Sequence, residues 1–435
     1  MHFTRLTALI VVVFAIGYAV FLRYKDKPSL GESLVSDKIS DEYDYVIVGA
    51  GSAGFVLASR LSENSNYRVL LLEAGDHFDN DKNIHIPVLA FNFLHSNFAW
   101  IYRSETENGM SIGLKDKRTV LNRGKGLGGS SSINACTYAR DSPFDFEEWE
   151  KKYGFNSFVT KIKTEEKVAT GVFFIKHGRK QFVKAKRDII LSAGAFNSPQ
   201  LLMLSGIGPK SHLQDLGIPV VQDLPVGKKF DDHINIVISS KINQPVHLDK
   251  EKDLELWSLL EYTLFGTGPL TSLYKAAAFL YIDKTKMERP DIMIILLPTT
   301  VGDNIILNYN ESVAKELIHP YINKPGFSAF VSLLHPRATG SVQLRSTDPF
   351  DSPMLDTNHL SDKQDEDDLL AGIRLLEEMV STDAMKSIGA DISTNKASFC
   401  SHYKFRSDDF WRCMVRHIAH NFYHSTSTCK MGMKR

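Results

Sequence analysis

The chain contains 435 residues, of which 43% are hydrophobic and 23% are charged. Such a length allows two or three domains with a substantial buried core. Lys plus Arg and Asp plus Glu number 51 each, so the charge balance gives no reason to expect nucleic-acid binding. Composition alone leaves an enzyme, a transporter subunit and a binding protein open.

An apolar run from Leu6 to Leu22 comes first, and Arg23, Lys25 and Lys27 follow it. The run is short for a bilayer span and long for the core of a signal peptide. No clear Ala-x-Ala cleavage site follows, which favours an uncleaved anchor, whereas the basic cluster favours a cytoplasmic C-terminal side and conflicts with simple secretion. We interpret residues 1–40 as a signal peptide or signal anchor with a linker; a buried helix or a misread start is the alternative. The expected location is the secretory pathway, extracellular or membrane-anchored.

The run Tyr43–Val48 (YDYVIV) predicts a β-strand because it is apolar and rich in β-branched residues. The turn G-A-G-S-A-G at 49–54 follows, then a predicted helix (FVLASRLSE) and a second predicted strand, Val69–Leu72, which ends at Glu73. Strand, Gly-x-Gly-x-x-Gly, helix, strand and acid form the dinucleotide-binding fingerprint in its usual setting. The alternative is a glycine-rich turn without a ligand.

Each residue type in this motif has a physical reason. Gly49 lets the strand turn sharply, Gly51 has no side chain to block a pyrophosphate, and Gly54 lets the helix pack closely on the strand. The start of the helix offers unpaired N–H groups and a partial positive charge to phosphates. Glu73 can accept hydrogen bonds from both ribose hydroxyls and would repel a 2′-phosphate. The motif by itself does not separate NAD from FAD.

Later stretches separate the two cofactors. Arg123–Asn134 reads RGKGLGGSSSIN, and a backbone so rich in small residues can lie flat against a large planar ligand, although a flexible linker is the alternative. The stretch SAGAFNSPQLLMLSGIGP at 192–209 follows a predicted strand, Ile189–Leu191, and Pro199 stands where a helix can begin. The stretch LPVGKKFDDH covers 224–233.

Together these stretches resemble the glucose–methanol–choline (GMC) oxidoreductase family, and their wording is closest to the insect glucose-dehydrogenase-like branch. The matching motifs occur in the family's order: YDYVIVGAGSAG, LLLEAG, RGKGLGGSSSIN, FDFEEW, LSAGAFNSPQLLMLSGIGP, LPVGKKFDDH, LLHPRATGSV and FYHSTSTCKMG. The resemblance implies an FAD-dependent oxidoreductase that transfers a hydride from a CH–OH carbon to flavin N5. The implied fold is α/β (α+β overall), with a doubly wound, Rossmann-like FAD-binding domain at 41–240. A substrate-binding domain with an antiparallel sheet at 241–335 and a C-terminal region at 336–435 would follow.

The residues that the resemblance implies for FAD binding fall in three groups. The ADP half would lie on the first glycine turn, the pyrophosphate and flavin along the Gly/Ser stretch, and the adenine against the backbone of one valine. In chain order they are Gly49, Gly51, Ser52, Ala53, Gly54, Glu73, Ala74, Gly128, Gly129, Ser130, Asn134 and Val159. No flavin-linking histidine is evident at the matching loop, so FAD is expected to bind non-covalently.

His424, in NFYHSTSTCKMG, matches the family's active-site histidine. Alcohol oxidation requires the hydroxyl proton to leave while the hydride is transferred, and an imidazole titrates near the working pH. As a cation it can then stabilise negative charge on the cofactor. The alternative is a surface histidine without a role, one of 15 in the chain.

Departures from the family pattern lower the activity expected of this chain. Ser427 stands where the family has a glycine near the flavin, so its side chain crowds the cofactor or its backbone is strained. The family continues past the position of Arg435 to a second active-site His or Asn. A long segment after Trp149 is missing, because Gly154–Phe158 leads directly into Val159 and VTKI, as expected from skipped exons, a splice variant or a degenerate paralogue. We therefore expect the chain, expressed alone, to bind FAD weakly and to aggregate.

The remaining sequence predicts an antiparallel sheet with helices outside it. Strands are predicted at Ile292–Leu297, Phe327–Leu334 and Ser341–Leu344, and a helix at Asp365–Val380. The acidic run Asp362–Asp368 is interpreted as a helix N-terminus stabilised by the helix dipole, with a metal site as the alternative.

The cysteines at 136, 400, 413 and 429 are too sparse for a disulfide scaffold and form no C-x-x-C motif. In an oxidising compartment Cys400 and Cys413 can pair across a short loop, and four unpaired thiols are an equal alternative. Asn310 begins a single glycosylation sequon, N-E-S.

The sequence leaves the substrate open among sugars, aliphatic alcohols, sterols and aryl alcohols. It also leaves open whether electrons pass to oxygen or to a quinone or dye. The expected partners are a small alcohol or sugar and an electron acceptor that the sequence does not identify, with no nucleic acid. Attachment to a membrane through an N-terminal anchor is an open alternative. Two other classes compete: a catalytically incomplete flavin-binding relative, and an NAD enzyme, which the fit of RGKGLGGSSSIN to a flavin loop disfavours.

Overall fold

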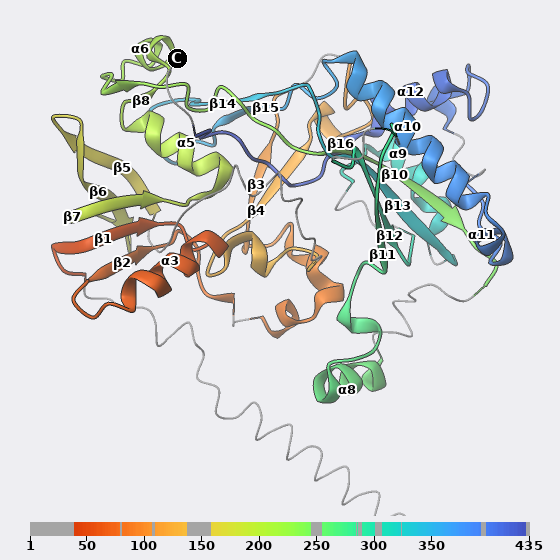
Figure 1. Ribbon diagram of the computed structural model, residues 1–435, viewed down its shortest axis with the longest axis horizontal. Coiled ribbons are helices and arrows are strands. Elements are labelled where there is room, and N and C mark those ends of the chain that lie inside the picture. The colour runs from red at the N-terminus through yellow and green to blue at the C-terminus, as the bar shows by residue number, and fades with distance from the viewer. Residues whose placement is uncertain are drawn as a thin grey trace, which may run out of the picture.

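The computed structural model describes residues 39–78, 81–106, 109–136, 158–244, 255–283, 285, 289–300, 307–322, 324–392 and 397–431. The apolar run Leu6–Leu22 and the motif FDFEEW at 144–149 lie outside these residues. Two lobes, each built on a five-stranded sheet, lie side by side, and a hairpin of β3 (Ala99–Arg103) and β4 (Val120–Gly124) lies between them (Figure 1). Within the described part of the chain, no helix has the length and apolar character needed to span a bilayer.

The first sheet has the strand order β2-β1-β7-β6-β5, with β1 (Glu42–Val48), β2 (Val69–Leu72) and β7 (Arg179–Leu191) parallel to one another. The antiparallel strands β6 (Val168–Lys176) and β5 (Phe158–Glu165) extend it. The predicted strands at 43–48, 69–72 and 189–191 are thereby confirmed.

Helices cover both faces of the first sheet, because β1 is buried on both sides and its side chains alternate between them. Val46 and Val48 pack with Leu201 of α5 (Gly194–Leu204) in one cluster. Ile47 packs with Leu57 of α3 (Ser52–Ser62) in another. The predicted doubly wound arrangement is therefore present.

Helix α5 spans Gly194–Leu204 and holds Pro199 inside it, so the prediction that a helix begins at Pro199 was wrong. Proline has no N–H, and the carbonyl of Ala195, one turn earlier, loses its helical donor. Thr428 Oγ1 donates to that carbonyl instead, at 2.6 Å. A side chain from the C-terminal motif thus replaces the missing helical bond and ties α5 to the loop that carries His424.

The second sheet is antiparallel, with the order β11-β12-β13-β10-β16. Its strands are β10 (Ile234–Lys241), β11 (Ala276–Leu280), β12 (Ile292–Leu297), β13 (Gly326–Leu333) and β16 (His420–Asn421). The predicted strands at 292–297 and 327–334 are confirmed. The strand predicted at 341–344 forms, but outside this sheet, because β14 (Ser341–Gln343) and β15 (Met354–Asp356) make a separate two-stranded sheet. β10 begins inside the range predicted for FAD binding, 41–240, but belongs to the second sheet.

The predicted helix at 365–380 is present as α10 (Lys363–Val380), which packs on β13 and on α12 (Asp408–Ile418). Asp362 caps its first turn by accepting from the N–H of Gln364, so the acidic run is a helix N-terminus as predicted. Buried Glu366 pairs with Arg416 of α12 at 2.8 Å.

Cys400 and Cys413 form a disulfide that joins the short helix η8 (Ser398–Cys400) to α12, while Cys136 and Cys429 are free thiols.

Shorter elements complete the described fold. They are η2 (Lys82–His85), η3 (Pro87–Phe93), η4 (Lys115–Lys117), η5 (Gly129–Ser132), β8 (Ile207–Gly208), α6 (Lys210–Asp215), β9 (Gln222–Asp223), η6 (Pro269–Thr271), α9 (Glu311–Leu317), η7 (His319–Tyr321) and α11 (Asp383–Ser387).

Helix α8 (Leu256–Phe265) projects away from the second lobe (Figure 1) and buries none of its residues. Leu256, Trp257 and Phe265 are 68%, 78% and 74% exposed. Exposed apolar side chains gathered on one helix mark a surface that associates with an apolar partner. It supports the expectation that the chain aggregates, which stays a prediction.

We expect the combined change Leu256→Gln, Trp257→Gln and Phe265→Gln to lower self-association of the purified chain. Burial of each large apolar side chain contributes roughly 1.5–3 kcal/mol, and glutamine keeps the helix propensity. Light scattering against protein concentration measures the effect. Val168→Gln, at a position 63% exposed on β6, is the matched control; if it lowers association as much, α8 is not the surface responsible.

Candidate active site

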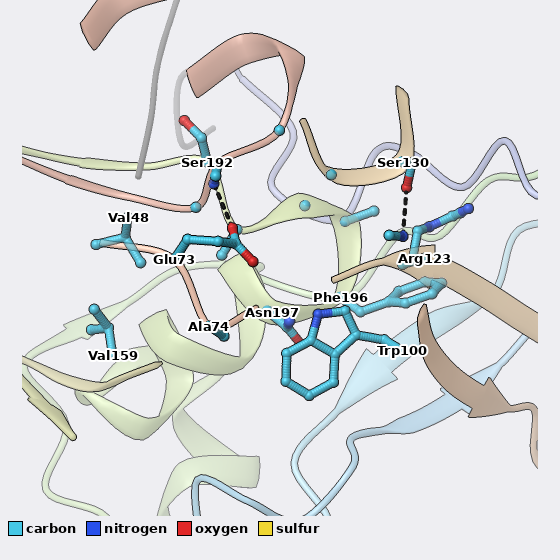
Figure 2. Close-up of a pocket in the computed structure, with 18 of the residues that line it drawn as sticks. Val48, Glu73, Ala74, Trp100, Arg123, Ser130, Val159, Ser192, Phe196 and Asn197 are labelled. Carbon is cyan, nitrogen blue, oxygen red and sulfur yellow. Dashed lines mark hydrogen bonds between the residues drawn. The ribbon is translucent and has the colours of Figure 1, made fainter. Parts of the chain in front are cut away.

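A cleft with an empty volume of about 1100 Å³, its open mouth included, lies where β1, β2 and β7 of the first sheet end. Ligands of open α/β sheets bind at such carboxyl ends. Figure 2 shows Glu73 within the cleft, with Val48 and Val159 on one side and Arg123, Ser130 and Phe196 on the other. The predicted cofactor residues that line it are Gly49, Gly51, Ser52, Ala53, Glu73, Ala74, Gly129, Ser130 and Val159.

The other predicted cofactor residues lie elsewhere. Gly54 is buried in α3, where helix and strand pack together. Gly128 precedes η5 with a φ of 96° and is not among the residues that line the cleft. Asn134 is exposed, and its Oδ1 accepts from the backbone N–H of Cys136. For all of these residues, a role in binding stays a prediction.

The first two glycines of this turn, Gly49 and Gly51, have different structural roles. Gly49 has a φ of 102°, and a Cβ there would lie 2.4 Å from the backbone oxygen of Ser192, so this position requires glycine for the fold. Gly51 has an extended backbone (φ −72°, ψ −176°), and a Cβ there meets no protein atom within 4 Å. The absence of a side chain at Gly51 therefore leaves space in the cleft for a ligand and is not required by the fold.

The Gly/Ser stretch lies directly against this turn. The N–H of Gly128 donates to the carbonyl of Ala50 at 2.7 Å, and Gly51 and Gly128 form a parallel β-bridge. A Cβ on Gly129 would approach the Cα of Gly51 to 2.9 Å. Two segments distant in sequence thus form one cradle, as the motifs predicted.

Glu73 lies at the end of β2, and its carboxylate is held by backbone donors. Oε2 accepts from Ala50 N–H at 2.6 Å and Oε1 from Gly75 N–H at 3.0 Å. Burial raises the pKa of this carboxyl, while the N–H groups of Ala50 and Gly75 oppose the rise. The hydrogen bonds fix its position in the cleft and leave lone pairs on both oxygens for a ligand.

Helix ends that open on the cleft lack side-chain caps. Neither α3 nor α5 has a capping hydrogen bond or an acidic residue in its first turn, and Ser52, Gly194 and Ala195 from these first turns line the cleft. Such ends offer N–H groups and partial positive charge. Arg123, a buried guanidinium, also lines the cleft, and its Nη2 has no hydrogen-bond partner among the described residues. The cleft therefore suits an anionic group such as a diphosphate.

Several lining residues were not predicted. Trp100 and Phe158 supply aromatic surface, with ring centroids 6.2 Å apart, and Lys125 lies 4.6 Å over the Trp100 ring. Tyr102 donates to Asn197 Oδ1 at 2.6 Å. Arg123 and Asn197 stand inside motifs that the sequence singled out, whereas Trp100 and Tyr102 carry no motif signal.

His424 lies outside the cleft lining but within reach of its wall. Arg123 Nη1 donates to the carbonyl of Tyr423, the residue before His424. Asp232 accepts from the N–H of His424 at 2.8 Å and from Ser425 Oγ at 2.6 Å. The ring of His424 reaches the surface, although protein surrounds most of it. This burial lowers the pKa of His424, and the negative charge of Asp232 opposes the shift.

Comparison with known proteins identifies the family. Models described as GMC oxidoreductase match residues 43–161 and 156–235 in the N-terminal part and 336–435 in the C-terminal part. An oxygen-dependent choline dehydrogenase of Brucella suis is 30% identical, over 90% of this chain and 86% of the relative. The chain belongs to the GMC oxidoreductase family. It is an FAD-dependent oxidoreductase, as predicted.

Other GMC relatives are similar over the same extent. Glucose dehydrogenase (FAD, quinone) of Drosophila melanogaster is 26% identical over 90% of this chain and 78% of its own length. Ecdysone oxidase of Bombyx mori is 27% identical over 93% and 77%. The crystal structure of formate oxidase superposes with a TM-score of 0.72 at 20% identity over 90% of this chain and 89% of that one, and shows the same fold.

This GMC oxidoreductase lacks internal positions that its relatives carry. The alignment with the Drosophila enzyme spans 510 residues although this chain has 435. The two N-terminal matches meet at 156–161, where the sequence predicted a junction between Phe158 and Val159. The predicted internal shortening is consistent with both observations.

The cleft of this GMC oxidoreductase fits FAD on its own geometry. The uncapped ends of α3 and α5 and the orphan donor of Arg123 suit a diphosphate, and the space at Gly51 admits one. Trp100 and Phe158 suit a planar base. The histidine that would act on a substrate follows Tyr423, whose carbonyl accepts from Arg123.

The loop that carries His424 is strained and held from several sides. Tyr423 and Ser427 have φ values of 61° and 69°, in a backbone region that residues other than glycine rarely adopt. A strained backbone was one of the two alternatives predicted at Ser427, and the positive φ bears it out. Arg123, Asp232 and the Thr428 hydroxyl hold this loop by the hydrogen bonds given above.

We expect Ser427→Gly to raise the free energy of unfolding by about 1 kcal/mol, because glycine adopts this φ without steric cost. Chemical denaturation of the full chain measures it. The same change at exposed Ser62 in α3, which has an ordinary helical backbone, should lower stability by about 0.5–1 kcal/mol. If Ser427→Gly also lowers it, the strain is not an energetic cost.

Proposed function

We propose that this GMC oxidoreductase oxidises the CH–OH group of a small alcohol or sugar, with His424 as the acid/base residue. One observation carries the proposal: the titratable imidazole of His424 stands on a loop that Asp232 holds at the His424 backbone N–H and that contacts Arg123 in the cleft wall. Fixed geometry is what proton transfer during hydride removal requires. The substrate class is supported by relatives named as glucose and choline dehydrogenases.

When bound, FAD supplies the hydride acceptor. His424, kept neutral near pH 7 by its lowered pKa, can accept the hydroxyl proton of the substrate at its free ring nitrogen. Asp232 and Arg123 prevent the loop from moving away as the charge appears. The buried positive charge of Arg123 favours negative charge in the adjoining cleft.

The proposal is tested by the colour of the purified full chain. Supplied with FAD and freed of excess, it should show flavin absorbance, and under nitrogen D-glucose, choline or benzyl alcohol should bleach it. Bound flavin that none of the three bleaches favours the alternative of a catalytically incomplete relative. A chain that stays colourless contradicts both.

The electron acceptor can be read from the same sample. Relatives are named both as quinone-linked and as oxygen-dependent. After bleaching, admission of air or addition of a quinone under nitrogen should restore the absorbance with one acceptor faster than with the other.

We also propose that the chain enters the secretory pathway and stays on a membrane. The apolar run Leu6–Leu22 and the Cys400–Cys413 disulfide, which is typical of oxidising compartments, support this. Alkaline extraction of cell membranes should leave the chain in the pellet. Release of a soluble, shortened chain into the medium would instead indicate a cleaved signal peptide.

A further inference from the structure

A second histidine contacts the proposed acid/base residue. His233 lies directly before β10, and its Nδ1 is 3.0 Å from the Nδ1 of His424. The two rings are nearly perpendicular, at 85°, with centroids 5.0 Å apart. The backbone locks this arrangement, since Phe422 N–H donates to the His233 carbonyl at 3.0 Å and Ile234 pairs with Asn421 across the β10–β16 ladder.

This contact constrains the protonation of both rings. A neutral imidazole carries one N–H and one acceptor nitrogen, so one Nδ1 donates and the other accepts. If His424 donates, its Nε2 keeps a lone pair and can take a proton from a substrate. If His233 donates, the N–H of neutral His424 is on Nε2, and no acceptor faces the substrate.

The surroundings of His233 suit the acceptor role. Burial lowers its pKa to about 4, with His424 and His335 adding to the effect and Asp232 opposing it, so the ring is neutral at pH 7. Asp232 and Arg123 are the charged groups that act on His424. When His424 gains a second proton on Nε2, its Nδ1–H still has a neutral acceptor, and no rearrangement is needed.

We infer that His233 is a positioning residue whose Nδ1 accepts from Nδ1–H of His424 and so keeps Nε2 of His424 available as the base. This rests on the proposed function for its catalytic meaning. The hydrogen bond itself is a separate, observable property of the chain.

Nitrogen NMR of the full chain with ¹⁵N-labelled histidine tests the tautomer directly, without substrate. Comparison with a His424→Gln sample identifies the His424 signals. We expect a protonated Nδ1 and an unprotonated Nε2 on His424, and loss of this preference in His233→Leu. A His424 that carries its proton on Nε2, or an unchanged preference in His233→Leu, overturns the inference even if the proposed function holds.

The rate of flavin bleaching gives the second readout, with whichever of D-glucose, choline or benzyl alcohol bleaches the wild type. His233→Leu should slow it by about 10- to 100-fold, and the acidic midpoint of the pH profile should move lower, because the imidazolium loses an acceptor. His233→Asn, which retains an acceptor oxygen, should recover most of the rate. Exposed His319→Leu is the control, and equal losses in all three variants would overturn the inference. If no alcohol bleaches the wild type, only the proposed function fails, and the NMR result alone decides the inference about His233.

Discussion

Gly51→Val should yield a chain that is folded but colourless. A Cβ at this position meets no other part of the protein within 4 Å and the backbone is extended, so a side chain can begin here without displacing the fold. Its side chain would instead occupy the part of the cleft beside the α3 N-terminus, where a diphosphate is expected. We expect FAD affinity to fall by at least about 100-fold, or about 2.7 kcal/mol. Flavin fluorescence released on denaturing the purified chain measures the loss.

Comparison of the two turn glycines makes this test specific. Gly51→Ala should weaken FAD binding less than valine, because it adds a single methyl group, and the thermal midpoint of the flavin-free chain should move little. Gly49→Ala should lower that midpoint strongly, since its Cβ would overlap the backbone of Ser192 and its φ is 102°. Flavin retained at the wild-type level in Gly51→Val would show that the diphosphate lies elsewhere.

The parts of the fold that the sequence predicted are those with local causes. The strand at 43–48, the glycine turn and the strand at 69–72 follow from β-branched runs and from glycines whose spacing meets a backbone requirement. Ser427 is a similar case, because the conformation that a motif glycine adopts is strained for any residue that replaces it. In each case the residue types of a single short segment carry the signal.

Contacts between distant segments were not predictable in the same way. Pro199 suggested a helix start, but the helix extends before it because Thr428, remote in sequence, donates to the carbonyl that proline leaves without a partner. His233 stood in a quoted motif, yet only the pairing of β10 with β16 brings it to His424. The role of Arg123 likewise depends on a contact between distant segments, the hydrogen bond that it donates to the carbonyl of Tyr423. Chemistry at this site depends on three chain segments meeting, which no single window of sequence encodes.

His424→Gln should retain FAD and lose its reduction by alcohol. Glutamine keeps much of the volume, and Asp232 still accepts from the backbone N–H at this position, so the loop should stay in place. Without a titratable base the rate of anaerobic bleaching should fall by about 10²- to 10⁴-fold. Stopped-flow absorbance with whichever of the three alcohols bleaches the wild type measures it.

The pH dependence separates a lost base from a damaged site. In the wild type the neutral imidazole is the active form, and burial holds the pKa of His424 below its usual range. The bleaching rate should therefore rise with pH through a midpoint that lies below pH 6.5. In His424→Gln the residual rate should not follow that titration, because the group that titrates is gone. A variant that bleaches at the wild-type rate, or one whose residual rate keeps the wild-type pH profile, would show that another residue takes the proton. The control is the flavin content of the two proteins. If it is equal, the difference in bleaching rate reflects the chemical step and not the binding of FAD.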